Sequence, residues 1–465
     1  MNDVNKVPIK IVKNIYWSQW LVASIACLLL IDNGLTTGWV SPYLARMTSS
    51  TSDMKIKLTD VEASWVVSIF NIGRIIGTII TVPMQDIIGR KKSLLISSVP
   101  LFFTWIFFTI ANSVSWIYAA RLCGGISSGI LWSVLAVLLG EIADPEIRGA
   151  VIFLNVNACS VGTLIGNIMG PYVSLEVFSY VCLIPIILFV GLFILLPDSP
   201  YYYMERKDVE NAEKSLKWYR RREDVKKELC MIQNYVEESV ASNTFLSKVQ
   251  EMWQPGNRKS AMILLSVNLF MNMAGVNTLN LYTEIIMKRS GISMTPSTVV
   301  IVIGVVIVLA GMMSSIFVDR FGRKSLLIAS SLGVAVTHAL LGLHFLLLSI
   351  GYDSNDLTWL PIITMILLNV FLYFGLYPIP SALVSEMFTS NVKTLASFGT
   401  AFSSSIFAFI ISKTFQPFLD VVEEHYVYWT YGAIVFLGVP YTYFCIPETK
   451  GKNFLQIQEL LREKT

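Results

Sequence analysis

The sequence predicts an all-α membrane protein whose twelve transmembrane helices form two pseudo-symmetric six-helix bundles. Hydrophobic residues make up 54% of the 465 residues and charged residues only 14%, about half the charged share of an average soluble protein. Apolar segments recur along the chain, and motifs of its first half return in its second half. A soluble or disordered chain is excluded, because water would contact too much apolar surface.

Twelve segments are apolar and long enough to cross a bilayer, which takes about 20 residues. The last six are interrupted by Pro, Gly and Asn more often than the first six. The predicted spans are about 15–39, 62–84, 93–112, 115–139, 150–172, 178–197, 261–287, 297–318, 325–350, 359–385, 395–417 and 426–446.

The stretch 198–259 contains 12 basic and 11 acidic residues with helical spacing, which predicts a solvated helical linker. It separates an N-terminal bundle (1–197) from a C-terminal bundle (260–446) and a tail (447–465). With both termini in the cytoplasm, cytoplasmic segments hold 27 Lys and Arg residues and outer segments hold six. This excess predicts that both termini and the tail are cytoplasmic.

The composition excludes several other classes of function. A net charge of +3 argues against nucleic-acid binding, and six irregularly spaced cysteines imply neither a metal site nor a disulfide framework. No Walker-type nucleotide motif is present in the sequence. No arrangement of nucleophile, base and orienting group stands out, so we expect no cofactor, no metal and no enzymatic activity.

Three landmarks occur twice in the same order. DIIGRK at 86–91 recurs as DRFGRK at 319–324, and Glu141 with Arg148 recurs as Glu386 with Lys393. PDSP at 197–200 recurs as PETK at 447–450. A shift of about 240 residues maps the first six spans onto the last six in parallel orientation, which is typical of two-halved transporters with a midplane binding site.

These motifs, together with RLCGG at 121–125 and GVN at 275–277, resemble the sugar-porter branch of the major facilitator superfamily. The resemblance covers about residues 34–454 and is greatest to the insect facilitated trehalose transporter-like proteins. It implies alternating access, in which the charged residues of these motifs lock the cytoplasmic side closed when the transporter faces outward. By this resemblance the cytoplasmic gate residues are Asp86, Arg90, Glu141, Arg148, Asp319, Arg323, Glu386 and Lys393. Alternatively, these charges serve only as positive-inside anchors and turn residues.

Three charged residues, Asp32, Arg74 and Arg121, fall inside predicted spans, where charges are costly and mark function. The family also carries Arg at the position of Arg121, whereas Arg74 replaces what resembles a family glycine. We expect Asp32 to pair with Arg74 or Arg121, because an unpaired buried charge is expensive. A carboxylate hydrated from the lumen is the alternative.

Polyol recognition needs amides and hydroxyls that donate and accept hydrogen bonds, and an aromatic face. In the seventh span, Asn268, Asn272 and Asn277 fall close to one helical face. In the tenth, Pro378 and Pro380 break the helix. The candidate substrate-binding residues are Asn277, Asn272, Asn268, Tyr282, Asn157, Thr36 and Tyr373. The alternative role of the asparagines is hydrogen bonding between helices.

The site departs from the family pattern at several positions. A glutamine pair before Gly-x-Asn is Met271–Asn272 here, and the glutamine of the fifth span is Val156. A Trp of the tenth span is Ser381, and an Asn–Trp pair of the eleventh is Ser403–Ser404. The lost Trp is consistent with a larger cavity for a disaccharide, whereas the lost glutamines are consistent with another solute or with no transport.

The sequence therefore favours a monomeric plasma-membrane uniporter for a sugar, with trehalose or a hexose as substrate. Proton-driven relatives carry an acid in the first span where this chain has Thr36, which favours facilitated diffusion. Proton-coupled symport through Asp32 remains an alternative. A sugar sensor without transport is a second alternative, disfavoured by a tail of only about 15 residues after the PETKG motif.

Overall fold

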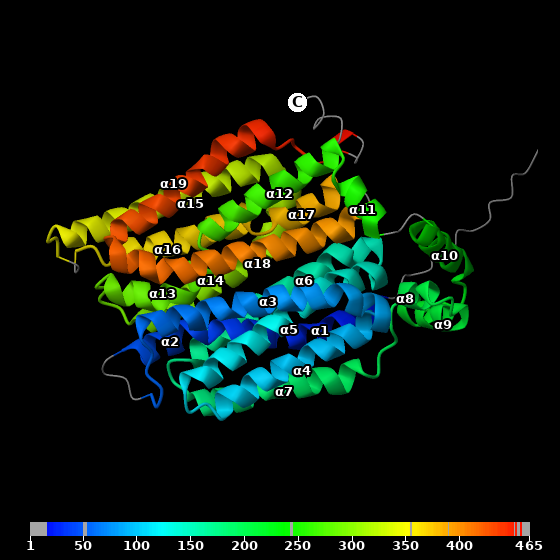
Figure 1. Ribbon diagram of the computed structural model, residues 1–465, viewed down its shortest axis with the longest axis horizontal. Helices are drawn as coiled ribbons and strands as arrows, with labels where there is room; N and C mark the ends of the chain where they lie inside the picture. The colour runs from blue at the N-terminus through cyan, green and yellow to red at the C-terminus, as the bar shows by residue number, and fades with distance from the viewer. Residues whose placement is uncertain are drawn as a thin grey trace, which may run out of the picture.

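The computed structural model describes residues 16–49, 54–241, 245–353, 356–388, 390–450, 452 and 456–457. Its regular structure within these ranges is helical. Two groups of long helices lie side by side, and the helices of the linker gather at one end of the molecule (Figure 1). We call this end the linker end.

The first bundle contains six long helices and a short α2 (Val40–Thr48) that continues the first of them almost without interruption. Within the bundle α1 packs on α6, α3 on α5, and α4 on both α5 and α7. The long helices are α1 (Trp17–Gly38), α3 (Asp60–Ile88), α4 (Arg90–Thr109), α5 (Val114–Ile142), α6 (Pro145–Met169) and α7 (Leu175–Phe193).

The second bundle repeats this plan with two interrupted spans. In it α15 packs on α16 and α19, and α12 packs on α18. Its elements are α12 (Pro255–Met273), α13 (Thr278–Arg289), α14 (Pro296–Phe321), α15 (Arg323–Ser349), α16 (Trp359–Phe371), the π-helical turn η1 (Leu372–Leu376), α17 (Ile379–Met387), α18 (Ser390–Val421) and α19 (Glu424–Cys445).

Eleven helical segments of the described residues are long and apolar enough to span a membrane. The remaining predicted span, 426–446, coincides with α19, whose 22 residues at about 1.5 Å each reach across a hydrocarbon core of about 30 Å. The predicted all-helical membrane fold is therefore confirmed.

The seventh and tenth spans are both interrupted, and the break in the tenth lies beside Pro378 and Pro380, where the sequence predicted one. Gly275 has φ +87°, a left-handed value that glycine adopts without strain, and it separates α12 from α13. The tenth span is divided by η1, where the Ser330 hydroxyl donates to Phe371 O at 2.7 Å and accepts from the Leu376 N–H at 3.0 Å. These bonds satisfy backbone groups that the break leaves without helical partners.

Close backbone contacts hold the first bundle together. A Cβ at Gly34 of α1 would lie 2.1 Å from the backbone oxygen of Cys159 in α6, so the two helices touch where only a glycine fits. Small residues permit such approaches in membranes, where dispersion and not water exclusion drives helix packing.

Among the described residues the main contacts between the bundles are those of α3 with α18, α6 with α14, and α2 with α13. Four helices form the linker: α8 (Pro200–Glu205), α9 (Val209–Arg220), α10 (Lys226–Ala241) and α11 (Phe245–Met252). Of these, α8 contacts α5 and α9 contacts α1. The linker helices α8 and α9 are therefore docked on the first bundle.

Candidate functional site

Three asparagines at the break between α12 and α13 form a chain of hydrogen bonds. The Asn277 amide donates to Asn272 Oδ1 at 3.2 Å, and the Asn272 amide donates to Asn268 O at 2.9 Å. The Asn268 amide donates to Thr400 O of α18 at 3.1 Å. Asn268 and Asn272 are buried, and Asn277 is half-buried. The structure thus brings together the three asparagines predicted from the seventh span, and we call them the asparagine chain.

Serines of α18 extend the asparagine chain toward the first bundle. Ser403 Oγ accepts from Asn268 at 3.2 Å, and Ser404 Oγ accepts from Asn272 at 3.4 Å. From α3 of the other bundle, Arg74 donates to Ser405 Oγ at 2.7 Å and to Ser404 Oγ at 3.5 Å. A polar network therefore crosses the interface between the bundles, and it includes the serines that replace the family's Asn–Trp pair.

Three other predicted residues lie on different helices. Tyr373 of η1 packs its ring 4.7 Å from that of Tyr377. Asn157 of α6 donates to Phe153 O, and its Oδ1 has no hydrogen-bond partner among the described residues. Thr36 of α1 is buried and donates to a backbone oxygen of its own helix. Within the ranges given above, no hydrogen bond joins these residues to the asparagine chain.

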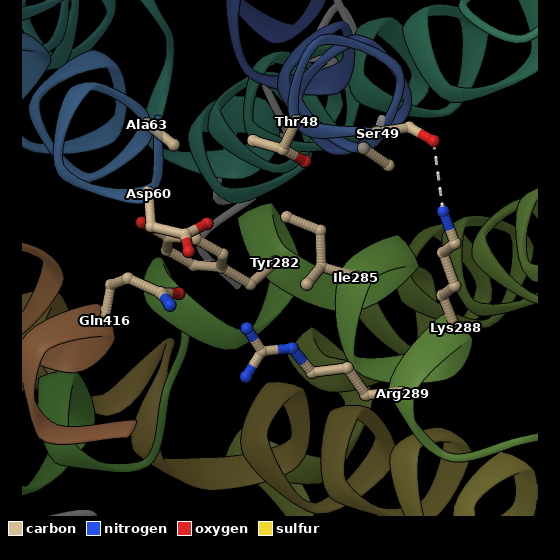
Figure 2. Close-up of a pocket in the computed structure, with 10 residues that line it drawn as sticks. Thr48, Ser49, Asp60, Ala63, Tyr282, Ile285, Lys288, Arg289 and Gln416 are labelled. Carbon is tan, nitrogen blue, oxygen red and sulfur yellow. Dashed lines mark hydrogen bonds between the residues drawn. The ribbon is translucent and has the colours of Figure 1, made fainter. Parts of the chain in front are cut away.

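A cavity of about 250 Å³ opens between the bundles at the end opposite the linker. Figure 2 shows Thr48 and Asp60 of the first bundle facing Tyr282, Arg289 and Gln416 of the second. The cavity is smaller than the roughly 300–1,000 Å³ of most ligand pockets. It is lined by Ala45, Thr48, Ser49, Asp60, Ala63, Tyr282, Ile285, Lys288, Arg289 and Gln416.

Tyr282 is the predicted substrate-binding residue that lines this cavity. Its hydroxyl has no hydrogen-bond partner within the described part of the chain. Beside it, Lys288 donates to Ser49 Oγ at 3.4 Å across the gap between the bundles, the bond drawn in Figure 2. The N–H of Glu284 donates to Ser41 Oγ at 3.1 Å across the same gap. Polar contacts from Ser41 of α2 and from Ser49, which follows it, thus join the first bundle to α13 beside the cavity.

The expected pairing of Asp32 with an arginine was wrong. Asp32 is fully buried inside the first bundle, where both its carboxylate oxygens accept from the Trp105 indole N–H at 3.0 and 3.1 Å. Arg121 donates to Thr36 O at 2.7 Å and to Val66 O at 2.9 Å. Arg121 thus donates to backbone oxygens and Arg74 to serine hydroxyls, whereas the Asp32 carboxylate accepts from Trp105 of α4.

The first-bundle motif that is predicted to form part of the gate centres on Arg90, which begins α4. Its guanidinium donates to Glu141 at 3.0 Å and to Glu205 of α8 at 2.5 Å, and the residue is only 8% exposed. The backbone N–H of Lys91 donates to Asp198 at 3.1 Å. Burial raises the pKa of Asp198, although its N–H donors favour the charged form. Arg90 therefore joins α8 of the linker to the start of α4 and the end of α5 in the first bundle.

The second bundle repeats these contacts. Arg323 donates to Glu386 at 3.0 Å, and the backbone N–H groups of Arg323 and Lys324 donate to Glu448 at 3.0 and 3.1 Å. Glu448 occupies the place that Asp198 has in the first bundle. The sequence repeat is thus a repeat of hydrogen-bonded contacts at equivalent helix ends.

The other predicted gate residues are placed differently. Arg148 donates to Ala143 O at 3.1 Å, whereas the Glu141 carboxylate accepts from Arg90. Partial burial and the nearby Arg148 charge lower the pKa of Lys393, so two cations from different bundles lie near each other. Asp86 is exposed at the end of α3, and its backbone oxygen accepts from Arg206. Asp319 belongs to α14, but its side chain lies outside the described residues.

Sequence reasoning missed two partners. Glu205 lies in a six-residue helix of the linker, and no local pattern connects it to Arg90. Ser405 is one of several serines in α18, and nothing in the sequence assigns it to Arg74. In contrast, Asp198 and Glu448 could have been found, because both are the acids of the repeated motifs at 197–200 and 447–450.

Comparison with known proteins assigns the family. Residues 22–461 match the family model described as "Sugar (and other) transporter". The chain belongs to this family. The family assignment confirms the resemblance seen in the motifs and makes the protein a multi-pass membrane transporter and not an enzyme.

Two relatives within the sugar transporters are facilitated trehalose transporters named Tret1. The protein of Polypedilum vanderplanki is 30% identical over 91% of this chain and 84% of its own length. The protein of Drosophila mojavensis is also 30% identical, over 95% of this chain and 51% of its own length. This chain therefore spans about half the length of the Drosophila relative.

A solved structure with the same fold is the major facilitator superfamily proton:xylose symporter XylE, determined with 6-bromo-6-deoxy-D-glucose bound. Its TM-score with this chain is 0.76 at 21% sequence identity, covering 96% of this chain and 99% of that chain. At this identity the similarity establishes the major facilitator fold.

Proposed function

We propose that this protein carries a sugar across the plasma membrane by facilitated diffusion, with trehalose or a hexose as the first candidate solutes. The observation that carries the proposal is the asparagine chain at the break between α12 and α13. Asn277 is half-buried there and presents an amide where the helix is interrupted. Amides donate and accept hydrogen bonds, as sugar hydroxyls require.

In this proposal the two bundles, at 1–197 and 260–446, rock against each other about the α3–α18 and α6–α14 contacts. The distribution of Lys and Arg favours a cytoplasmic linker end, so 198–259 and the tail at 447–465 are proposed to be cytoplasmic. The cavity beside Tyr282 then serves as the outer entrance. Both bundles and the interface between them belong to one chain, which is the basis for proposing a monomeric transporter.

The Arg90 and Arg323 contacts have the proposed gate function. Each joins the beginning of one helix to the end of another at the linker end, and at Arg90 also to α8. Such contacts stabilise one arrangement of the helix ends, and their loss shifts the population between states. Arg148 and Lys393 are proposed to favour opening, because their like charges repel across the bundle interface.

Counterflow into liposomes that contain the purified protein tests the proposal directly. Saturable exchange of labelled trehalose or glucose is expected, because counterflow requires only alternating access and no ion gradient. Asn277→Ala should raise the half-saturating sugar concentration about fivefold to tenfold, the loss of one or two hydrogen bonds. A folded wild-type protein that exchanges neither sugar would contradict the proposal, and binding without exchange would favour a sensor.

Asp32→Asn tests the alternative of proton coupling. Asp32 is fully buried against Trp105 and away from the bundle interface, so we expect the variant to keep the external-pH profile of sugar uptake. Uptake is measured between pH 5.5 and 8 in the same liposomes, with and without a proton gradient. A wild-type response to the gradient that the variant loses would establish symport instead.

A further inference from the structure

Arg74 is a cation within a membrane-spanning helix, at the interface between the bundles. It lies in the middle of α3, is partly buried and donates to Ser405 and Ser404 of α18. Among the residues that the structure describes, it forms no ion pair with a carboxylate. The Tyr377 phenol lies near it, and a phenol is ordinarily neutral at physiological pH.

The other intramembrane arginine has a complete set of partners and serves as a comparison. Arg121 is 2% exposed, donates to two backbone oxygens and lies 4.5 Å from the centre of the Phe70 ring and 5.7 Å from that of Trp39. These contacts enclose it within the first bundle. Arg74 differs because it points out of its own bundle, toward neutral hydroxyls of the other one.

Two serine hydroxyls do not neutralise a guanidinium. A charge at this depth is stable when it faces an opposite charge or a water-filled path, and such residues mark solute and ion pathways. Ser404 connects Arg74 to the asparagine chain, because its hydroxyl accepts from Arg74 and also from Asn272. Arg74 and the proposed sugar site therefore share an acceptor.

We infer that Arg74 binds an anionic substituent of the solute, a carboxylate or a phosphate, while the asparagine chain binds the hydroxyls. This inference rests on the proposed function, because it places the solute at the asparagine chain, and it narrows the solute to a sugar acid or a sugar phosphate. A guanidinium presents parallel N–H donors that match the oxygens of either group. The hydroxyls of Ser404 and Ser405 hold the Arg74 guanidinium beside the asparagine chain.

The experiment compares glucose, glucuronate and glucose 6-phosphate with wild-type protein and Arg74→Gln. Binding is measured as the shift in melting temperature of the purified protein with increasing ligand, which requires no transport. Wild-type protein should bind one of the two anions about tenfold or more tighter than glucose, and Arg74→Gln should abolish that preference. The anion that binds distinguishes a carboxylate from a phosphate.

Lys413→Gln is the matched control. Lys413 is a second cation on the same helix pair, where it donates to Ser64 Oγ at 2.7 Å and lies 4.1 Å from the Trp65 ring centre. It follows Ser405 by eight residues, about 12 Å along α18. Its variant should keep the wild-type preference among the three solutes.

Net uptake under an imposed membrane potential gives a second readout. Net uptake of an anion by the wild type moves charge and should depend on the potential, whereas net uptake of glucose should not. Equal affinity for all three solutes, or an Arg74→Gln variant that retains the preference, would overturn the inference. Glucose exchange without any anion binding would overturn it and leave the proposed sugar transport intact. Binding of none of the three would also overturn it, and trehalose counterflow would then decide the proposed sugar transport separately.

Discussion

Replacing Arg90 by alanine is expected to release the linker from the first bundle and to destabilise the protein by about 3–5 kcal/mol. The guanidinium is 8% exposed and contacts the carboxylates of Glu141 and Glu205. Removing one partner of a buried ion pair leaves uncompensated charge, which costs far more than the pair contributes. Thermal unfolding of the purified variant and hydrogen exchange of α8 (Pro200–Glu205) would measure the two effects.

Arg148→Ala is the matched control for this prediction. Arg148 lies at the same end of the bundle but donates only to the Ala143 backbone oxygen among the described residues. We expect the stability to fall by at most about 1 kcal/mol, the value of an ordinary hydrogen bond, and amide hydrogen exchange in α8 to stay at the wild-type rate. Equal destabilisation by both variants would show that charge at this end matters more than the specific contact. Glu205→Gln should increase amide hydrogen exchange in α8 as Arg90→Ala does, with a smaller loss of stability.

Replacing Asn272 by leucine is expected to weaken sugar binding by roughly 30-fold without unfolding the protein. Its amide donates to Asn268 O and Ser404, and its oxygen accepts from Asn277. Leucine has as many side-chain heavy atoms as asparagine and branches at the same carbon, so the shape is largely kept while about 2 kcal/mol of hydrogen bonding and positioning is lost. Counterflow kinetics and sugar-dependent thermal stabilisation are the measurements.

Asn155→Leu provides the comparison. Asn155 of α6 is also buried, but its amide donates to Val151 O of its own helix and its oxygen has no partner within the described residues. The variant removes an unpaired polar atom, so we expect unchanged affinity and slightly higher stability. If Asn155→Leu impairs sugar binding as much as Asn272→Leu, the asparagine chain is not the site.

The charged motifs at the linker end show how far the sequence goes. It places Arg90 and Glu141, and again Arg323 and Glu386, in motifs that recur in the same order. The structure adds which of these charges meet, because Arg90 contacts Glu141 and Arg323 contacts Glu386. Acid and base seven residues apart do not pair, however, since Pro145 begins a new helix between Glu141 and Arg148. A repeat therefore locates equivalent helix ends, but it does not show which charges meet there.

The intramembrane charges show the opposite limit. Hydropathy locates Asp32, Arg74 and Arg121 within apolar spans and predicts that each must be satisfied. Which partner satisfies them depends on the rotation of each helix about its axis. Trp105 lies 73 residues from Asp32 and Ser405 lies 331 residues from Arg74, and no local pattern encodes either contact.

The sequence by itself determined the membrane environment, the two-bundle plan, the linker and the positions of the paired motifs. These follow from composition, hydropathy and an internal repeat, which are properties of the chain read along its length. Only the tertiary structure decided that α12 breaks before Asn277, that Asp32 contacts Trp105 and that Arg74 reaches the serines of α18. Each of these depends on side chains from distant segments, which meet only when the helices pack.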